Sequence, residues 1–279
     1  MAHERAWGRR WSGARLERDE GLRRDVLERL GRGWSPRTVA NRLAIERGRR
    51  VISHESIYRF VFGQMARLKD YSWRRYLPQG KSKRGFRGRR GGSSVSTMLL
   101  RRPITERPAE ASDRRTCGHW EADTMLFVRS GELALVVHER HSRLLLAARL
   151  GSKEAGGVAA VLRELLGPLP PALRRTATFD NGTEFARHYE LHALGMETFF
   201  CDTYSPWQKG GVENAIGRLR RYLPRKVNLK EVSEERFRLI MQAYNHTPRK
   251  CLGYRTPAEV FTAQVSHFNC EFTFPPARE

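Results

Sequence analysis

Three acidic residues in the second half of the sequence occur where a carboxylate is unusual. Asp123 interrupts GHWEADTMLFV, whose alternation is typical of a strand, and Asp180 ends a second apolar stretch, TATFD. Glu213 lies beside the apolar stripe of a helical pattern further along the chain. Carboxylates brought close together repel one another, and a bound divalent cation is one way to tolerate that. The three residues therefore predict a site for Mg²⁺ or Mn²⁺, which prefer oxygen ligands.

Each carboxylate also has a simpler interpretation. Asp180 opens DNGTEF, in which Asp-Asn-Gly is a turn sequence, so it is compatible with a turn cap. Asp123 is compatible with an edge position in water, and Glu213 with an ordinary solvated helix residue. Asp180 follows Asp123 by 57 residues, and Glu213 follows Asp180 by 33. The residues alone leave these alternatives open.

The elements that must position these residues follow from the periodicity of the sequence. Three strands in succession are followed by alternating helices and strands, which favours an α/β layer with a mixed sheet. In chain order we expect strands at 119–128, 132–140 and 142–150, a helix at 153–166, a strand at 176–180, a helix at 184–195, a strand at 196–201 and a helix within 204–224. On the first strand, Trp120 and Ala122 fall on one face, and Glu121, Asp123 and Met125 on the other.

The charge is concentrated in the first half. The chain has 279 residues and a formal net charge of +22, and residues 1–120 hold 30 Lys and Arg against 12 Asp and Glu, a net of +18. Such a surplus predicts a polyanionic partner, and double-stranded DNA is the first candidate. The sequence has no amphipathic anchor or long apolar run that would favour a membrane. Four cysteines without Cys-x-x-Cys spacing and no signal peptide predict a reduced, cytoplasmic protein.

Three short helices are expected near the N-terminus, at 19–30, 34–48 and 53–65. Ser35 and Ser53 are the predicted N-caps of the second and third. The predicted apolar stripe of the third consists of Ile57, Tyr58, Val61, Phe62 and Met65. This arrangement predicts a helix-turn-helix whose last helix lies in the major groove, with His54, Glu55, Ser56 and Arg59 facing outward. A small helical bundle used for packing or dimerisation is the alternative.

Two further groups of basic residues are predicted to contact DNA. The segment 81–94 has no acidic residue and reads as a flexible basic linker, in which the DNA-binding candidates are Lys81, Lys83, Arg84, Arg87, Arg89 and Arg90. A solvated tether is the alternative for that segment. Lys209 and Arg220 share the helical face of Glu213, where a phosphate would approach.

Several ordered motifs resemble one known family. GHWEAD, FDNGTEFARH, YSPWQKGGVENAIGRLRRYLPRK and NHTPRKCLGYRTPAEVF are similar to the insertion sequence 30 family of bacterial transposases, over roughly residues 33–265. The resemblance implies an RNase H-like mixed five-stranded sheet flanked by helices, preceded by an all-α helix-turn-helix domain. It implies that Asp123, Asp180 and Glu213 are the catalytic triad and ligate Mg²⁺ or Mn²⁺. It also implies cleavage and strand transfer of DNA by a homodimer or higher oligomer.

This resemblance and the composition together predict the domain organisation. We expect a basic tail at 1–20, a helix-turn-helix domain at 21–78, a basic linker at 79–112, a catalytic domain at 113–267 and a C-terminal tail at 268–279. Family members usually carry a further helix-turn-helix, for which the 32 residues before Gly33 are too few. A shortened, non-catalytic repressor is therefore one alternative function. A general nuclease is another, although it leaves the helix-turn-helix unexplained.

Overall fold

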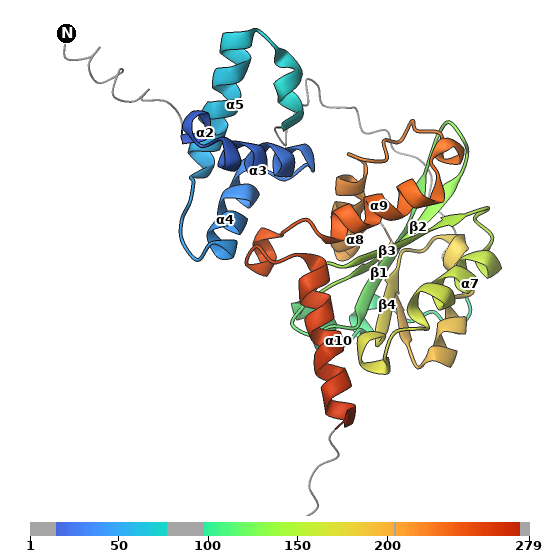
Figure 1. Cartoon of the computed structure of the whole chain (residues 1–279). Helices are drawn as coiled ribbons and strands as arrows, with labels where there is room; N and C mark the ends of the chain where they lie inside the picture. The colour runs from blue at the N-terminus through green and yellow to red at the C-terminus, as the bar shows by residue number, and fades with distance from the viewer. Residues whose placement is uncertain (1–14, 77–97, 204, 274–279) are drawn as a thin grey trace, which may run out of the picture. The chain divides into compact units, whose positions relative to one another are not determined.

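A computed structural model describes residues 15–76, 98–203 and 205–273 of the chain. The chain divides into two compact units (Figure 1). The first comprises Met1–Arg89 with Thr247–Arg255, and the second comprises Arg90–His246 with Thr256–Glu279. None of the described helices is both long enough and apolar enough to cross a bilayer.

The first unit contains the predicted N-terminal helices. They are α3 (Glu20–Gly31), α4 (Pro36–Glu46) and α5 (His54–Leu68), preceded by α2 (Arg15–Arg18) and followed by the 3₁₀ helix η1 (Tyr71–Tyr76). Both predicted caps are confirmed: the Thr38 N–H donates to Ser35 Oγ at 3.1 Å, and the Ser56 N–H donates to Ser53 Oγ at 3.0 Å. Helix α2 falls in the predicted tail, and its Leu16 is fully buried.

The buried face of α5 differs from the predicted stripe. Its buried residues repeat at i, i+3, i+4, i+7 and i+8, and are Ile57, Phe60, Val61, Gln64 and Met65. Phe62 was placed in the stripe by the sequence prediction, which is wrong, because its side chain is 54% exposed. It stacks instead on Tyr58, with the ring centroids 6.4 Å apart. The core of this unit therefore uses Phe60 where the sequence favoured Phe62.

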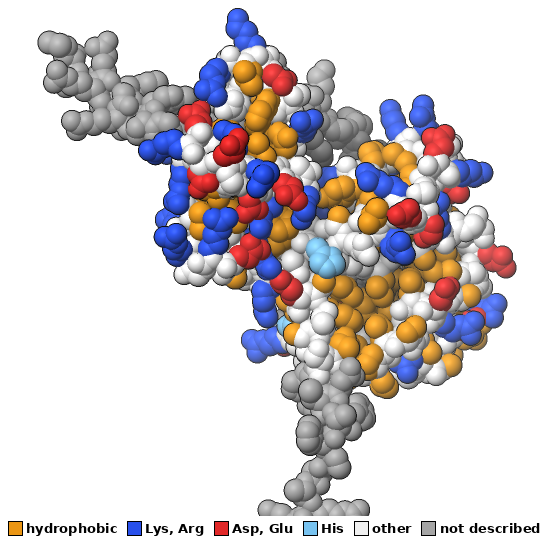
Figure 2. All heavy atoms as spheres, in the orientation of Figure 1, with side chains coloured by type: hydrophobic (Ala, Val, Ile, Leu, Met, Phe, Trp, Pro, Cys, Tyr) orange, Lys and Arg blue, Asp and Glu red, His pale blue; other side chains and the backbone are white. Residues whose placement is uncertain are grey.

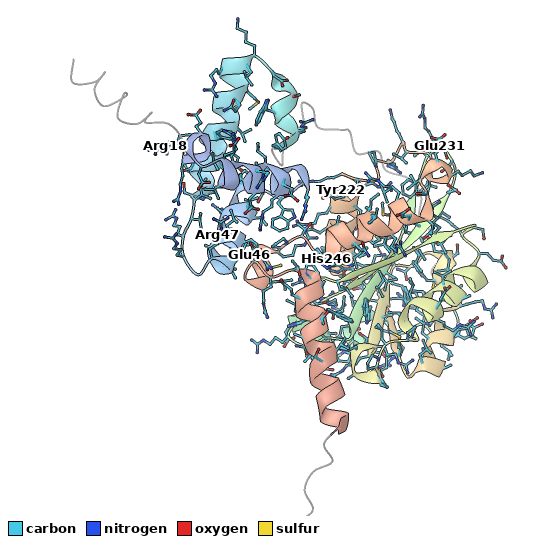
Figure 3. The ribbon with its side chains drawn as sticks, in the orientation of Figure 1. Arg18, Glu46, Arg47, Tyr222, Glu231 and His246 are labelled. Atoms are coloured by element: carbon cyan, nitrogen blue, oxygen red, sulfur yellow. The ribbon has the colours of Figure 1, made fainter. Side chains whose placement is uncertain are left out.

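Ion pairs neutralise part of the positive charge of this unit. At the end of α4, Glu46 accepts hydrogen bonds from Arg29 and Arg42, and the adjacent Arg47 pairs with Asp25 at 3.3 Å (Figure 3). Although partial burial opposes the effect, the two guanidinium groups lower the pKa of Glu46. Figure 2 accordingly shows acidic side chains among the basic ones on this unit.

The second unit is built on the predicted mixed sheet. Its strands are β1 (His119–Leu126), β2 (Leu133–Glu139), β3 (Leu145–Leu150), β4 (Thr176–Phe179) and β5 (Glu197–Phe200). They lie in the order β3-β2-β1-β4-β5. The first three pair antiparallel, whereas β4 is parallel to β1 and β5 is parallel to β4. The expected α/β, RNase H-like five-stranded sheet is thereby confirmed.

Helices cover both faces of this sheet (Figure 1). Trp120 and Ala122 of β1 belong to the core that contains the buried residues of α7 (Ala155–Leu166). Met125, on the opposite face of β1, belongs to the core under α8 (Gly210–Leu219) and α9 (Glu234–Asn245). The predicted alternation along β1 is confirmed. Helices α9 and α10 (Pro257–Thr273) were not predicted from the sequence. Phe261 of α10 packs edge-on against Trp120.

The predicted helix at 184–195 is replaced by two 3₁₀ helices, η5 (Thr183–Phe185) and η6 (His188–Leu194). Tertiary hydrogen bonds account for the difference. The buried His188 ring bonds to Thr198 Oγ1 at 2.8 Å and to the Leu99 carbonyl at 2.9 Å, which holds this segment against β5. The remaining short helices are η3 (Ile104–Glu106), α6 (Ala109–Asp113), η4 (Pro171–Leu173), η7 (Pro206–Lys209), η8 (Leu229–Glu231) and η9 (Lys250–Leu252).

Candidate active site

Two of the predicted carboxylates lie at equivalent positions on neighbouring parallel strands, Asp123 within β1 and Asp180 directly after the last residue of β4. The register pairs Glu121 of β1 with Thr178 of β4, so Asp123 and Asp180 each follow two residues later on adjacent strands. Asp180 Oδ1 accepts the Gly182 N–H at 3.2 Å, which is the predicted turn chemistry. Asp123 Oδ1 accepts the Thr124 N–H at 2.8 Å. In each aspartate, Oδ1 thus accepts a nearby backbone N–H, and the other oxygen, Oδ2, faces a common neighbour.

That neighbour is Lys209, at the start of α8. Its Nζ lies 3.0 Å from Asp180 Oδ2 and 3.5 Å from Asp123 Oδ2, and donates to the Ala122 carbonyl at 3.0 Å. The residue is only 4% exposed. The sequence analysis predicts Lys209 as a DNA contact on the helical face of Glu213. In the structure its ammonium lies inside the unit and faces the two aspartates, and its contact with DNA stays a prediction.

The charges of this cluster shift the pKa values of its members. Burial raises the pKa of Asp123, with a further contribution from Asp180, and Lys209 only partly offsets this. Burial acts to lower the pKa of Lys209, but Asp123 and Asp180 outweigh it and the pKa is raised. Lys209 is therefore charged at neutral pH, and its ammonium compensates part of the negative charge of the two carboxylates.

The third predicted carboxylate is placed differently. Glu213 is exposed on α8, four residues after Lys209. Within the described ranges, no three His, Cys, Asp or Glu side chains are grouped closely enough to hold a metal ion. The structure thus brings Asp123 and Asp180 together on Lys209 and leaves Glu213 outside that contact. The role of Glu213 in a triad stays a prediction.

A further carboxylate near Asp180 went unnoticed in the sequence. Glu184 Oε1 accepts a hydrogen bond from the Thr124 hydroxyl at 3.2 Å and lies 3.4 Å from Lys153 Nζ. A Cβ added to Gly182 would lie 2.5 Å from Glu184 Oε2 and 3.1 Å from Asp180 Oδ1, so the two acids flank this glycine. The signal was present in DNGTEF, where an acid follows the turn at short range.

The predicted DNA contacts on α5 have mixed surroundings. Arg59 is exposed and pairs with Glu55 at 3.5 Å. His54 is half-buried, and the Ser56 hydroxyl lies 2.8 Å from Ser53 Oγ, at the cap. Arg59 is thus the candidate on α5 whose side chain is most available to a phosphate or a base edge.

The other predicted contacts lie at α8 or outside the described residues. Arg220 donates from Nη2 to the Leu126 carbonyl at 3.0 Å, and its Cζ lies 4.9 Å from the centre of the Phe127 ring. The candidates in the basic linker lie outside the described part of the chain: Lys81, Lys83, Arg84, Arg87, Arg89 and Arg90. Trp207, two residues before Lys209, is 74% exposed and was not among the predicted contacts.

No protein-family model matches the chain. The chain is 32% identical over 257 residues to the transposase InsI for insertion sequence element IS30A of Escherichia coli, covering 90% of this chain and 67% of that protein. It is 34% identical over 258 residues to the transposase for insertion sequence element IS1086 of Cupriavidus metallidurans, covering 90% and 75%.

Among solved structures, the catalytic core domain of BIV integrase is similar to this chain, with a TM-score of 0.44 and 23% identity, over 55% of this chain and 97% of that one. The two transposase alignments each cover nine tenths of the sequence, and the sheet is the mixed five-stranded sheet that the resemblance implies. On these grounds the chain belongs to the insertion sequence 30 family of transposases.

Proposed function

We propose that the chain cuts and joins DNA at the ends of an insertion sequence in a reaction that depends on a divalent metal. One observation carries the proposal: Asp123 and Asp180, from adjacent strands, converge on a single buried cation, the Lys209 ammonium. A position at which two carboxylates and the Ala122 carbonyl already surround a cation suits a hard divalent ion. Glu213, in the first turn of α8, follows Lys209 by four residues.

Asp123, Asp180 and Glu213 are the residues that would hold Mg²⁺ or Mn²⁺. When bound, such ions activate a water or a 3′-hydroxyl and stabilise the leaving 3′-oxygen. The chain's own residues position the reaction. Asp180 is fixed by its turn, Asp123 by its strand, and Lys209 supplies positive charge beside them. No covalent intermediate with the protein is required.

Double-stranded DNA, as transposon end and as target, is the proposed partner, and a homodimer or higher oligomer the proposed active form. The net charge of +22 supports a polyanionic partner. Exposed Arg59 on α5 is the proposed sequence-reading contact. The proposed role of the basic linker is to contact the phosphate backbone of the transposon end or of the target DNA.

The test is a nicking assay on labelled DNA that carries the element's terminal repeat, with Mg²⁺, with Mn²⁺ and with a chelator. We expect cleavage only with metal. Glu213→Gln should abolish cleavage while DNA binding and the thermal midpoint are retained, because a neutral amide is a poor ligand for Mg²⁺. Glu164→Gln, an exposed acid on α7, is the matched control and should cleave normally. Normal cleavage by Glu213→Gln would remove this residue from the site, and binding without cleavage by the unaltered chain would favour a repressor.

A further inference from the structure

Glu121 is an acid that neither the triad nor DNA binding explains. It lies in the middle of β1, two residues before Asp123 and on the same face of the strand, and it is completely buried. Burying a carboxylate costs several kcal/mol unless its oxygens are paired. Its partners therefore indicate what the residue does.

Both oxygens of Glu121 are engaged, by different parts of the unit. Oε1 forms a short ion pair with Arg140 Nη1, and Oε2 accepts the Val212 N–H at 2.8 Å. Arg140 is itself only 4% exposed, and its Nε donates to the Ala111 carbonyl at 2.6 Å. The carboxylate thus joins the middle of β1 to the first turn of α8, and Arg140 holds it from the other side.

The approach of α8 to this carboxylate is close enough to exclude a side chain. A Cβ added to Gly211 would lie 2.6 Å from Glu121 Oε2 and 3.2 Å from His138 Nδ1. The neighbouring Gly210 differs, because a Cβ there would meet no atom within 4 Å. Of these two adjacent glycines in one helical turn, only Gly211 is required by the contact.

The residues of the candidate site lie on both sides of this contact. Val212 directly precedes Glu213 and follows Lys209 by three residues, so the hydrogen bond to Glu121 fixes the turn that carries both. We propose that Glu121 is a positioning residue: held by Arg140, it sets the start of α8 relative to β1 so that Lys209 meets Asp123 and Asp180. This inference rests on the proposed function for its effect on catalysis, but the contact itself can be tested without it.

An ion pair in the core is not needed for stability alone, since apolar residues of similar size often serve as well. The carboxylate adds a defined geometry, because its two oxygens accept from two different donors, Arg140 and the Val212 N–H. Glu121→Gln separates these roles. An amide has one oxygen, so it can accept from Arg140 or from Val212 but not from both, and its NH₂ opposes the other donor.

The decisive comparison is Gly211→Ala against Gly210→Ala in the full chain. Both exchanges add one methyl group in the same helical turn and both raise helix propensity, yet only the first displaces Glu121. The first measurement is acylation of Lys209 by an amine-reactive ester, followed by mass spectrometry with exposed Lys226 as the internal reference. We expect at least a tenfold rise in Lys209 labelling for Gly211→Ala and Glu121→Gln, and no change for Gly210→Ala.

The second measurement is single-turnover nicking at saturating DNA. Gly211→Ala and Glu121→Gln should slow nicking at least tenfold and raise the Mn²⁺ concentration needed for half the maximal rate, with the DNA dissociation constant within about twofold of the unaltered chain. Gly210→Ala should match the unaltered chain. A role in stability alone predicts instead that folding and DNA binding fall together with activity, which would overturn the proposal.

Equal Lys209 labelling in the two alanine variants would also overturn it. If the unaltered chain does not cleave DNA at all, the proposed function fails. The labelling comparison still decides whether Glu121 positions the start of α8.

Discussion

Lys209 is a lysine that behaves as part of an acidic site. It is almost fully buried, and its ammonium contacts the side chains of Asp123 and Asp180 and the Ala122 carbonyl. A buried lysine with this many oxygen partners remains charged, and the two aspartates depend on that charge for their proximity. The cluster therefore sets one ammonium against two carboxylates.

Lys209→Met should destabilise the second unit when no divalent ion is present. Without the ammonium the aspartates face one another uncompensated. Because the Asp180 side chain is 48% exposed, the loss should be about 1–3 kcal/mol, the range for leaving a hydrogen-bonding group without its partner. Urea unfolding in a chelator measures this, and exposed Lys226→Met is the control. Mn²⁺ should stabilise the Lys209→Met variant more than the unaltered chain, and equal losses in the two variants would contradict the role given to Lys209.

His119 predicts an acid-sensitive step in stability. It is buried, with Nδ1 at 2.9 Å from Thr176 Oγ1, and burial lowers its pKa to about 4. Glu110, 3.5 Å from Nε2, acts in the opposite direction, whereas Arg175, Arg140 and Arg107 add to the lowering. Between pH 6.5 and about 4 the unfolded chain binds a proton that the folded chain does not.

The free energy of unfolding should therefore fall as the pH is lowered through this window, with a contribution from His119 of up to about 1.4 kcal/mol per pH unit. Urea unfolding at a series of pH values measures the slope. His119→Asn should flatten it, whereas His246→Asn, at an exposed site, should not (Figure 3). A slope that persists in His119→Asn would assign the effect to another group.

At the scale of elements, the sequence predicted the parts with strong periodicity. All five strands, the N-terminal helices α3, α4 and α5, and helices α7 and α8 were placed correctly, because each has a clear apolar repeat and most have a cap or a turn at one end. The segment at 184–195 was predicted as a helix from its local pattern, and this was wrong because the His188 ring is held by β5 and by the Leu99 carbonyl. Local periodicity contains no information about such distant partners.

In the candidate site, too, some features could be predicted from the sequence and others depend on contacts between distant residues. That Asp123 and Asp180 could lie side by side followed from the sequence, because both were placed on strands of one sheet. The burial of Lys209 and the joint between Glu121 and α8 could not be predicted, because Ala122 is 87 residues from Lys209 and Glu121 is 91 from Val212. The sequence around Lys209 does not show that this lysine is buried, because its burial depends on how α8 packs on the sheet.

Among the helices, α5 offers a direct test of the caps. Ser53→Ala removes the acceptor for the Ser56 N–H and should lower the stability of the first unit by about 1 kcal/mol. Ser53→Asp retains a side-chain acceptor and should restore most of it. Circular dichroism during thermal unfolding provides the measurement. Equal stability in the Ala and Asp variants would show that the cap contributes little here.

At the scale of the whole molecule, the imbalance of charge bears on the proposed binding to DNA. The first 120 residues have a net charge of +18 out of a total of +22. Replacing Lys81, Lys83, Arg84, Arg87, Arg89 and Arg90 by Gln should weaken binding to all DNA sequences alike. The slope of log affinity against log salt should flatten by about 0.9 for each phosphate that the variant no longer neutralises. Exchanging Lys for Arg and Arg for Lys at the same positions retains the charge and should keep the slope, and an unchanged slope in the Gln variant would reduce the segment to a tether.

The distances along the chain that separate the partners at the site have a kinetic consequence. β1 pairs with β4 across 57 residues, and the bonds from Ala122 to Lys209 and from Glu121 to Val212 close loops of 87 and 91. Such contacts form slowly, because the entropy of closing each loop is lost before any packing is gained. During synthesis both aspartates leave the ribosome well before Lys209 does. The nascent chain thus contains its acids before the cation that neutralises them, so the site assembles only after α8 has been made.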